Sequence, residues 1–289
     1  MLYTIRSSSM TAAISSKGAQ LMSLQGTDDT QYLWQGDPKY WSDRSLTIFP
    51  YVARLTEGSY RYQHRLYHMP IHGFAPGSEF TVTNQSESAV TFTLESSPKL
   101  YAQYPFLFRL AICYWLEEST LHVEITVENR GKKTMYFGLG GHPGINVPLE
   151  KGLSFEDYVL EFPPCRPLRV EFTPACFVTG QEQPFPLEGN RLPLSHDMFD
   201  EDAIVLKGIP GKVTLRSDKS HRGVTLIAPD FPFFGFWHMP KTDAPYICLE
   251  PWSSLPSHQD VIEDLEKQAD LISLPALKTY QTIWSLRCF

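Results

Sequence analysis

Three segments of the sequence each set ionisable side chains beside glycine or proline at the end of an apolar run. They contain Arg54 (FPYVARL) with His72 (MPIHGFA), His142 (GGHPGIN) and Glu250 (ICLEPW). Because glycine and proline fix the backbone path, such residues are expected to emerge from buried strands into loops, where scaffolds present catalytic groups. A carboxylate, two imidazoles and a guanidinium are suited to acid–base chemistry on a polyhydroxylated ring.

Each of these residues, taken alone, also has a structural explanation. Glu250 lies in an apolar stretch, so its carboxylate must be paired, protonated or functional, and an ion pair with Arg54 is the structural alternative. A single histidine after a strand is more often structural than catalytic. The two glycines before His142 favour function there, since they permit a ligand to approach the backbone closely.

Aromatic residues occur near these segments in the sequence, at Trp34, Phe74 and Trp252. Aromatic faces can stack on the C–H face of a sugar while charged groups hold its hydroxyls. Together with the ionisable residues, they predict a small-molecule sugar as the partner.

The elements that position these residues are predicted to be strands. The dominant hydrophobic period is two, Ser59–Met69 is typical of a hairpin, and 23 prolines disfavour long helices. The only helix-like pattern is Gln259–Asp270, which is short and charged. We therefore expect an all-β fold: one large antiparallel β-sandwich domain over residues 1–289, with little helix.

Composition excludes several classes of protein. The net charge is −7 and no basic run occurs, which argues against nucleic acid or an anionic membrane surface as a partner. No apolar stretch is long enough to span a membrane, and the N-terminus lacks the apolar core of a secretory signal. Five scattered cysteines are typical of reduced thiols. We therefore expect a cytoplasmic protein.

An ordered set of motifs resembles the aldose 1-epimerase, or mutarotase, family. The motifs are GAQLMSL, QYLWQGDPKYW, FPYVARL, MPIHGFA, GGHPGINVP and LEPW, and they span nearly the whole chain. They look closest to a bacterial aldose 1-epimerase-like branch with a YLWQGDP-type segment. The resemblance implies a galactose mutarotase-like β-supersandwich, an isomerase acting on carbohydrate, and neither a cofactor nor a metal.

The resemblance also implies roles for individual residues. Glu250 matches the general base and His142 the general acid, which together interconvert the α and β anomers of a hexopyranose by ring opening. His72 and Arg54 match residues that bind the sugar. Trp34, Phe74 and Trp252 are then expected at the sugar cleft.

An acidic residue that binds sugar hydroxyls is expected in the second half of the chain. Asp202 is the best match, with Asp200 as the alternative. The chain departs from better-known galactose mutarotases at Val52, Gly144 and Ser253, where those proteins carry asparagine or aromatic residues. These departures concern the identity of the sugar.

Other functions stay open from sequence alone. A non-catalytic sugar-binding or sensing protein could use the same fold. A hexose-phosphate mutarotase would need a cationic pocket, and only Lys39 and Arg44 lie upstream of Arg54. A metal site could use the evenly spaced His64, His68 and His72, although the hairpin pattern disfavours such a site. Neither the sugar nor the oligomeric state can be read from the sequence.

Overall fold

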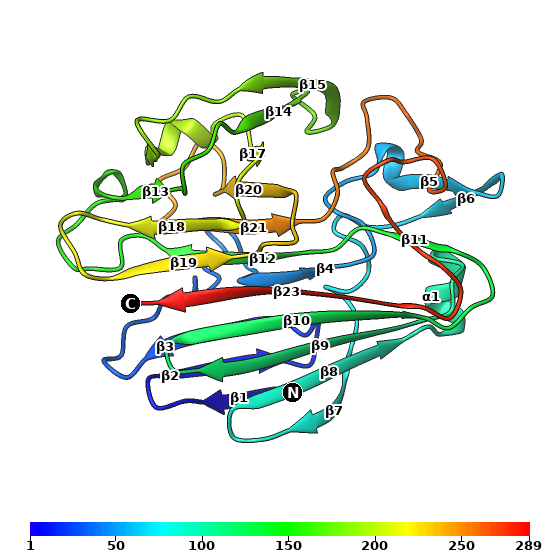
Figure 1. Ribbon diagram of the computed structural model, residues 1–289, viewed down its shortest axis with the longest axis horizontal. Helices are drawn as coiled ribbons and strands as arrows, with labels where there is room; N and C mark the ends of the chain where they lie inside the picture. The colour runs from blue at the N-terminus through cyan, green and yellow to red at the C-terminus, as the bar shows by residue number, and fades with distance from the viewer.

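The computed structural model describes residues 1–289, and its framework is two large antiparallel β-sheets (Figure 1). The first sheet has nine strands, and β23 runs through its middle between β10 and β19. In spatial order they are β16 (Arg191–Pro193), β13 (Val159–Glu161), β18 (Lys212–Arg216), β19 (Gly223–Ile227), β23 (Thr279–Cys288), β10 (Thr120–Asn129), β9 (Phe108–Glu117), β8 (Ala89–Glu95) and β7 (Thr81–Gln85).

The second large sheet has seven strands and carries the candidate site. In spatial order they are β15 (Val178–Pro184), β14 (Leu168–Phe172), β17 (Ile204–Lys207), β20 (Phe233–Trp237), β21 (Tyr246–Trp252), β12 (Gly140–Asn146) and β4 (Ser45–Ile48). Strand makes up 47% of the chain and helix 6%, which confirms the predicted all-β class.

Smaller elements surround the two large sheets. They are the three-stranded sheet β1 (Leu2–Arg6), β2 (Met10–Ser15) and β3 (Leu21–Gly26), the hairpin β5 (Ser59–Tyr62) and β6 (Arg65–His68), the pair β11 (Met135–Phe137) and β22 (Ile272–Leu274), and 3-10 turns at Thr56–Gly58, Phe155–Asp157 and His196–Phe199. No helix has both the length and the apolar character that a membrane span requires.

Alternating burial explains why the long strands form one sheet. Along β9 and β10, every second residue is buried, and the ladder between them runs from Phe108 opposite Asn129 to Glu117 opposite Thr120. The buried rows pack into a single large hydrophobic core. Strands β12, β20 and β21 are buried on nearly every residue. One of their faces packs on the core, and the other lies beneath the candidate site.

The helical content lies elsewhere than the sequence pattern predicted. Gln259–Asp270 forms turns, and the one α-helix is α1 (Pro98–Gln103). Ser97 caps its first turn by accepting a hydrogen bond from the Leu100 N–H at 3.3 Å, and Pro98 occupies the first helical position. The helix-like pattern at Gln259–Asp270 does not form a helix, because charged side chains at helical spacing need an apolar face to bury.

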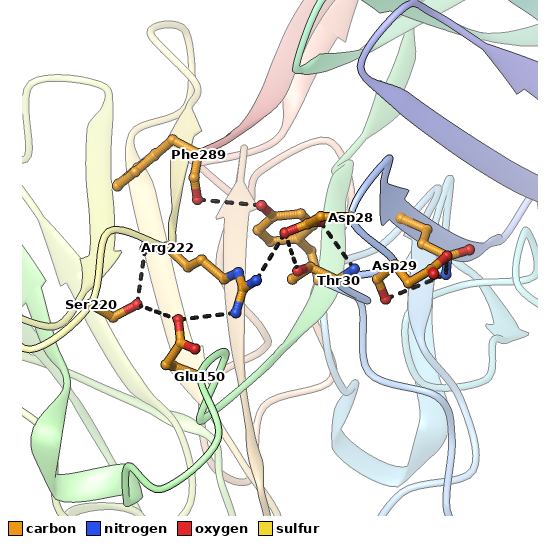
Figure 2. A network of polar contacts seen from close by, with 9 residues as sticks. Asp28, Asp29, Thr30, Glu150, Ser220, Arg222 and Phe289 are labelled. Atoms are coloured by element: carbon orange, nitrogen blue, oxygen red, sulfur yellow. Dashed lines mark hydrogen bonds and ion pairs between the residues drawn. The ribbon is translucent and has the colours of Figure 1, made fainter.

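A polar network joins distant loops at one end of the sandwich. Figure 2 shows the Arg222 guanidinium between two carboxylates, 2.9 Å from Asp28 and 3.0 Å from Glu150. Nearby, the Tyr32 hydroxyl donates a hydrogen bond to the carbonyl of Phe289 at 3.3 Å. The network therefore links the N-terminal sheet to loops of the second half and to the C-terminus.

Candidate active site

His142 and Glu250 lie on β12 and β21, which are neighbouring antiparallel strands of the seven-stranded sheet. The register pairs Gly144 with Cys248, so two residues further along each strand His142 lies opposite Glu250. Opposite residues share one face of a sheet. The Nε2 atom of His142 is accordingly 3.3 Å from the Oε2 atom of Glu250.

Both residues were expected in loops, and both lie within strands instead. The glycines of GGHPG, which suggested a loop, are needed because neighbouring tryptophans occupy the space of their side chains. A Cβ on Gly141 would lie 2.8 Å from the ring of Trp284, and one on Gly144 would lie 3.1 Å from that of Trp41. The strand therefore continues through the motif, and the sheet itself carries His142.

Burial decides the charge state of the pair. Glu250 is 1% exposed and His142 is 7% exposed. Burial raises the pKa of Glu250 well above its ordinary value, and the indole N–H of Trp252 partly offsets this by donating to Oε2 at 3.1 Å. Burial, with His72 adding to it, holds the pKa of His142 well below its usual range. A neutral carboxyl group beside a neutral imidazole is therefore favoured over an ion pair in the free site.

Two tryptophans enclose the imidazole of His142. Trp41 lies over it with ring centroids 4.8 Å apart, and Trp237 meets it edge-on at 5.7 Å. Nδ1 of His142 is buried and has no hydrogen-bond partner. Neither tryptophan was predicted, although Trp41 ends the QYLWQGDPKYW motif that carried the resemblance.

His72 is held by the backbone of the segment that precedes Arg54. The N–H of Ala53 donates to Nδ1 of His72 at 3.3 Å, and the His72 N–H donates to the carbonyl of Ala53 at 2.8 Å. Burial, together with the Arg54 guanidinium, lowers the pKa of His72 to about 4. The His72 ring is therefore neutral near pH 7, with its proton on Nε2. It packs edge-to-face with the ring of His142, and the two ring centroids are 5.3 Å apart.

Close packing fixes the two loop segments that carry Arg54 and His72. His72 and Gly73 both have positive φ, at 61° and 77°. A Cβ on Gly73 would lie 2.2 Å from the carbonyl oxygen of Phe49, so only glycine fits. Two motifs separated by a hairpin are thereby fastened to one another.

Arg54 lines the cavity beside His72. The ion pair between Arg54 and Glu250 that the sequence left open is absent, because His142 and Trp252 are the polar neighbours of the Glu250 carboxylate. The predicted pairing of Glu250 with Arg54 is therefore wrong. The guanidinium remains available to a ligand in the cavity.

The acidic run at 200–202 divides between two places. Glu201 and Asp202 line the cavity, whereas Asp200 lines a polar depression beside it. Asp202 has a positive φ of 88°, and its carboxylate accepts a hydrogen bond from the Cys176 thiol at 2.6 Å. The placement of Asp202 agrees with the residue chosen from sequence, and its role remains a prediction.

A cavity of about 480 Å³ opens over these groups. The lining is mainly apolar and aromatic, with a few ionisable side chains: Trp41, Asp43, Leu46, Ala53, Arg54, Ile71, His72, His142, Phe172, Cys176, Glu201, Asp202, Ala203, Val205, Trp237, Met239, Pro240, Glu250, Trp252 and Pro256. Such a mixture is typical of small-molecule sites.

Two of the three predicted aromatic residues lie outside the cavity. Trp34 stacks on Tyr246 at 4.6 Å and donates its indole N–H to the carbonyl of Trp41 at 2.8 Å, so it supports Trp41 from behind. Phe74 packs in the core against Phe108. Proximity in sequence cannot show which face of the sheet a ring occupies, and only Trp252 of the three lines the cavity.

The residues that could hold a metal differ from those considered from sequence. His64 and His68 lie on the β5–β6 hairpin, which confirms the hairpin and separates them from the site. One donor atom each of His142, Cys248 and Glu250 lie within 4.8 Å of one another. Burial raises the pKa of the Cys248 thiol well above its ordinary value, which disfavours the thiolate that metal binding requires. A metal site made of these three residues is therefore disfavoured.

Comparisons with known proteins agree with the fold. The family model for aldose 1-epimerase matches residues 1–263. Plasmid-encoded protein LacX of Lactococcus lactis subsp. lactis is 31% identical over 291 residues, covering 96% of this chain and 97% of LacX. A galactose mutarotase-related enzyme from Lactobacillus acidophilus has a TM-score of 0.95 and 32% identity, covering 100% of this chain and 97% of the other. A galactose mutarotase-like protein from Lactobacillus casei ATCC 334 also has a TM-score of 0.95, with 34% identity and full coverage of both chains.

Proposed function

The chain belongs to the aldose 1-epimerase family, and we propose that it interconverts the α and β anomers of a sugar by acid–base catalysis at Glu250 and His142. Family membership supports an isomerase of the mutarotase type. The single observation that carries the residue assignment is the 3.3 Å separation of the two side chains on one face of the sheet, within the cavity.

The reaction needs one proton, which the pair can supply. In the free site the one proton of the pair resides on Glu250, and in this proposal it moves to His142 before ring opening. The Glu250 carboxylate then takes the proton of the C1 hydroxyl while the His142 imidazolium donates one to the ring oxygen. The C1–O5 bond breaks and leaves an aldehyde, which rotates about C1–C2. Reversal of the two proton transfers closes the ring on the other face. The pair holds one proton before and after each transfer, so no co-reactant is consumed.

The other cavity residues have distinct tasks in this proposal. His72 is neutral with a proton on Nε2, so it can donate to a sugar oxygen near His142. Arg54 donates to hydroxyl oxygens, and Asp202 accepts from hydroxyl groups. Trp41 and Trp237 offer aromatic surfaces for the C–H face of the ring.

The charges around the cavity support an uncharged sugar as substrate. Arg54 is the one lysine or arginine in the lining, which also contains the acidic residues Asp43, Glu201, Asp202 and Glu250. A phosphate would need several cationic donors and would be repelled by these carboxylates. A hexose phosphate is therefore disfavoured.

The experiment that tests the proposal is an anomer-exchange measurement by NMR or polarimetry. Fresh α-glucose or α-galactose is added to the purified protein, and the rate is compared with the spontaneous rate. Glu250→Gln should lower kcat by about 10²–10⁴-fold, since it removes one positioned proton-transfer group. His142→Asn should act on kcat more than on KM. His72→Asn should affect both constants.

Two outcomes would contradict the proposal. Full exchange activity in Glu250→Gln would remove the base assignment. Sugar binding by the wild-type protein without faster exchange would favour a non-catalytic sugar-binding protein. Because the active pair holds one proton, kcat/KM should depend on pH in a bell-shaped way. It should fall when the pair gains a second proton and when the pair loses its only one.

A further inference from the structure

The two oxygens of the Glu250 carboxylate have different surroundings. Oε2 accepts a hydrogen bond from the indole N–H of Trp252 at 3.1 Å and lies 3.3 Å from Nε2 of His142. No donor of the protein bonds to Oε1, and Glu250 lines the cavity. Since Trp252 and Glu250 are two residues apart on β21, their side chains leave the same face of the sheet.

Two glycines make room for this arrangement. Gly140 is opposite Trp252 on one neighbouring strand, and Gly235 is opposite Glu250 on the other. A Cβ on Gly140 would lie 3.2 Å from Cδ1 of Trp252, and one on Gly235 would lie 3.3 Å from both Cζ2 of Trp252 and Cβ of Glu250. No side chain of the two neighbouring strands therefore occupies the space in which the indole of Trp252 folds back along β21. Trp252 is 4% exposed, so little of its ring remains for stacking on a sugar.

We propose that Trp252 is a positioning residue for the catalytic carboxylate, holding Oε2 through its indole N–H so that Oε1 receives the proton of the sugar. This inference rests on the proposed function, because it takes Glu250 as the base. It differs from the sugar-stacking role that the sequence suggested for Trp252.

The chemistry of the indole explains why this matters for turnover. An indole N–H can donate a hydrogen bond but cannot accept one. It therefore stabilises the carboxylate and disfavours a proton on Oε2. The proton from the C1 hydroxyl then goes to Oε1, where the sugar lies. Without Trp252, the Glu250 carboxylate would lose the hydrogen bond from the indole N–H and could rotate about its Cγ–Cδ bond.

The test is Trp252→Phe, which keeps an aromatic ring and removes the N–H. The titration of Glu250 is followed by ¹³C NMR with glutamate labelled at Cδ, and anomer exchange is measured over the same pH range. Because a hydrogen bond to a charged group contributes about 1.5–3 kcal/mol, the pKa of Glu250 should rise by about one to two units. The limb of the pH–rate profile that follows Glu250 should move with it.

Trp34→Phe is the matched control. It removes one indole N–H hydrogen bond in the same region, but that bond ends on the carbonyl of Trp41. The Glu250 titration should stay in place in this variant. An unchanged titration in Trp252→Phe, with a raised KM for the sugar, would overturn the inference in favour of stacking.

A second measurement serves if Trp252→Phe does not fold. In the wild-type protein labelled with ¹⁵N-tryptophan, an indole N–H signal should titrate with the Glu250 midpoint and stop titrating in Glu250→Gln. Absence of any such signal would overturn the inference. These measurements do not require turnover, so a wild-type protein without anomer exchange would contradict the proposed function and still leave the role of Trp252 decided.

Discussion

Glu250→Gln should stabilise the protein while it removes activity, and the gain should depend on pH in a defined way. Glu250 is buried, and its folded pKa is well above the unfolded value near 4.5. Below pH 4.5 the side chain is neutral in both states and behaves like glutamine. Above pH 4.5 the unfolded state gains free energy by ionising, whereas the folded state does not. The wild-type protein therefore loses stability relative to Glu250→Gln as pH rises.

The size of the effect follows from proton linkage. Between the unfolded and the folded pKa, the free energies of unfolding of the two proteins should diverge by about 1.4 kcal/mol per pH unit. For a chain of this size, each kcal/mol corresponds to about 2–4 °C in Tm. The difference in Tm should therefore grow by about 3–6 °C per pH unit and become constant once the folded carboxyl ionises.

Thermal unfolding in steps from pH 4 to pH 8 measures this difference. Glu87→Gln is the control, since Glu87 is exposed and its replacement should give only a small change in stability. A wild-type protein that is more stable than Glu250→Gln at pH 8 would refute the reasoning. So would a difference that does not change with pH, because it would mean that the buried carboxyl is already ionised at pH 4.5.

Three further predictions concern the scaffold of the site. Gly73→Ala should lower stability by several kcal/mol and displace His72, because its Cβ would overlap the Phe49 carbonyl; calorimetry and sugar affinity measure this. Burial lowers the pKa of His238 to about 4, so stability should fall as pH drops from 6.5 to about 4, and His238→Asn should reduce that fall in acid-unfolding curves. Arg222→Met should lower Tm by a few degrees at low salt, and less at high salt, because it leaves two carboxylates unpaired.

The hydrophobic pattern was enough to predict the class of fold. Period-two alternation indicated strands throughout the chain, and the Ser59–Met69 pattern identified the β5–β6 hairpin. It could not predict that β23, the last strand, lies between β10 and β19, since that pairing depends on contacts between distant parts of the chain. Helix α1 was missed although Ser97 and Pro98 provided a start signal, because a six-residue helix has too few residues to show a period.

The site was predicted in its ionisable residues more than in its aromatic ones. Burying a carboxylate in an apolar strand costs free energy, so the sequence around Glu250 indicated either a partner or a function for it. Tryptophans are ordinary in cores, and sequence alone cannot tell Trp41, which lines the cavity, from Trp34, which supports it from behind. Trp237 was missed for the same reason. The register that sets His142 against Glu250 also could not be predicted, because it is a property of two strands and not of either one.

The position of the proposed acid–base pair within a hydrogen-bonded ladder has a consequence for how such a protein can change over generations. His142 and Glu250 are fixed by the sheet, whereas Arg54, His72 and Asp202 come from connecting segments. Under the proposed function, insertions and exchanges in those segments can alter which sugar is accepted without disturbing the proton transfer. A single-residue deletion in β21 would instead turn Glu250 to the opposite face. Specificity can thus drift while the chemistry is inherited intact.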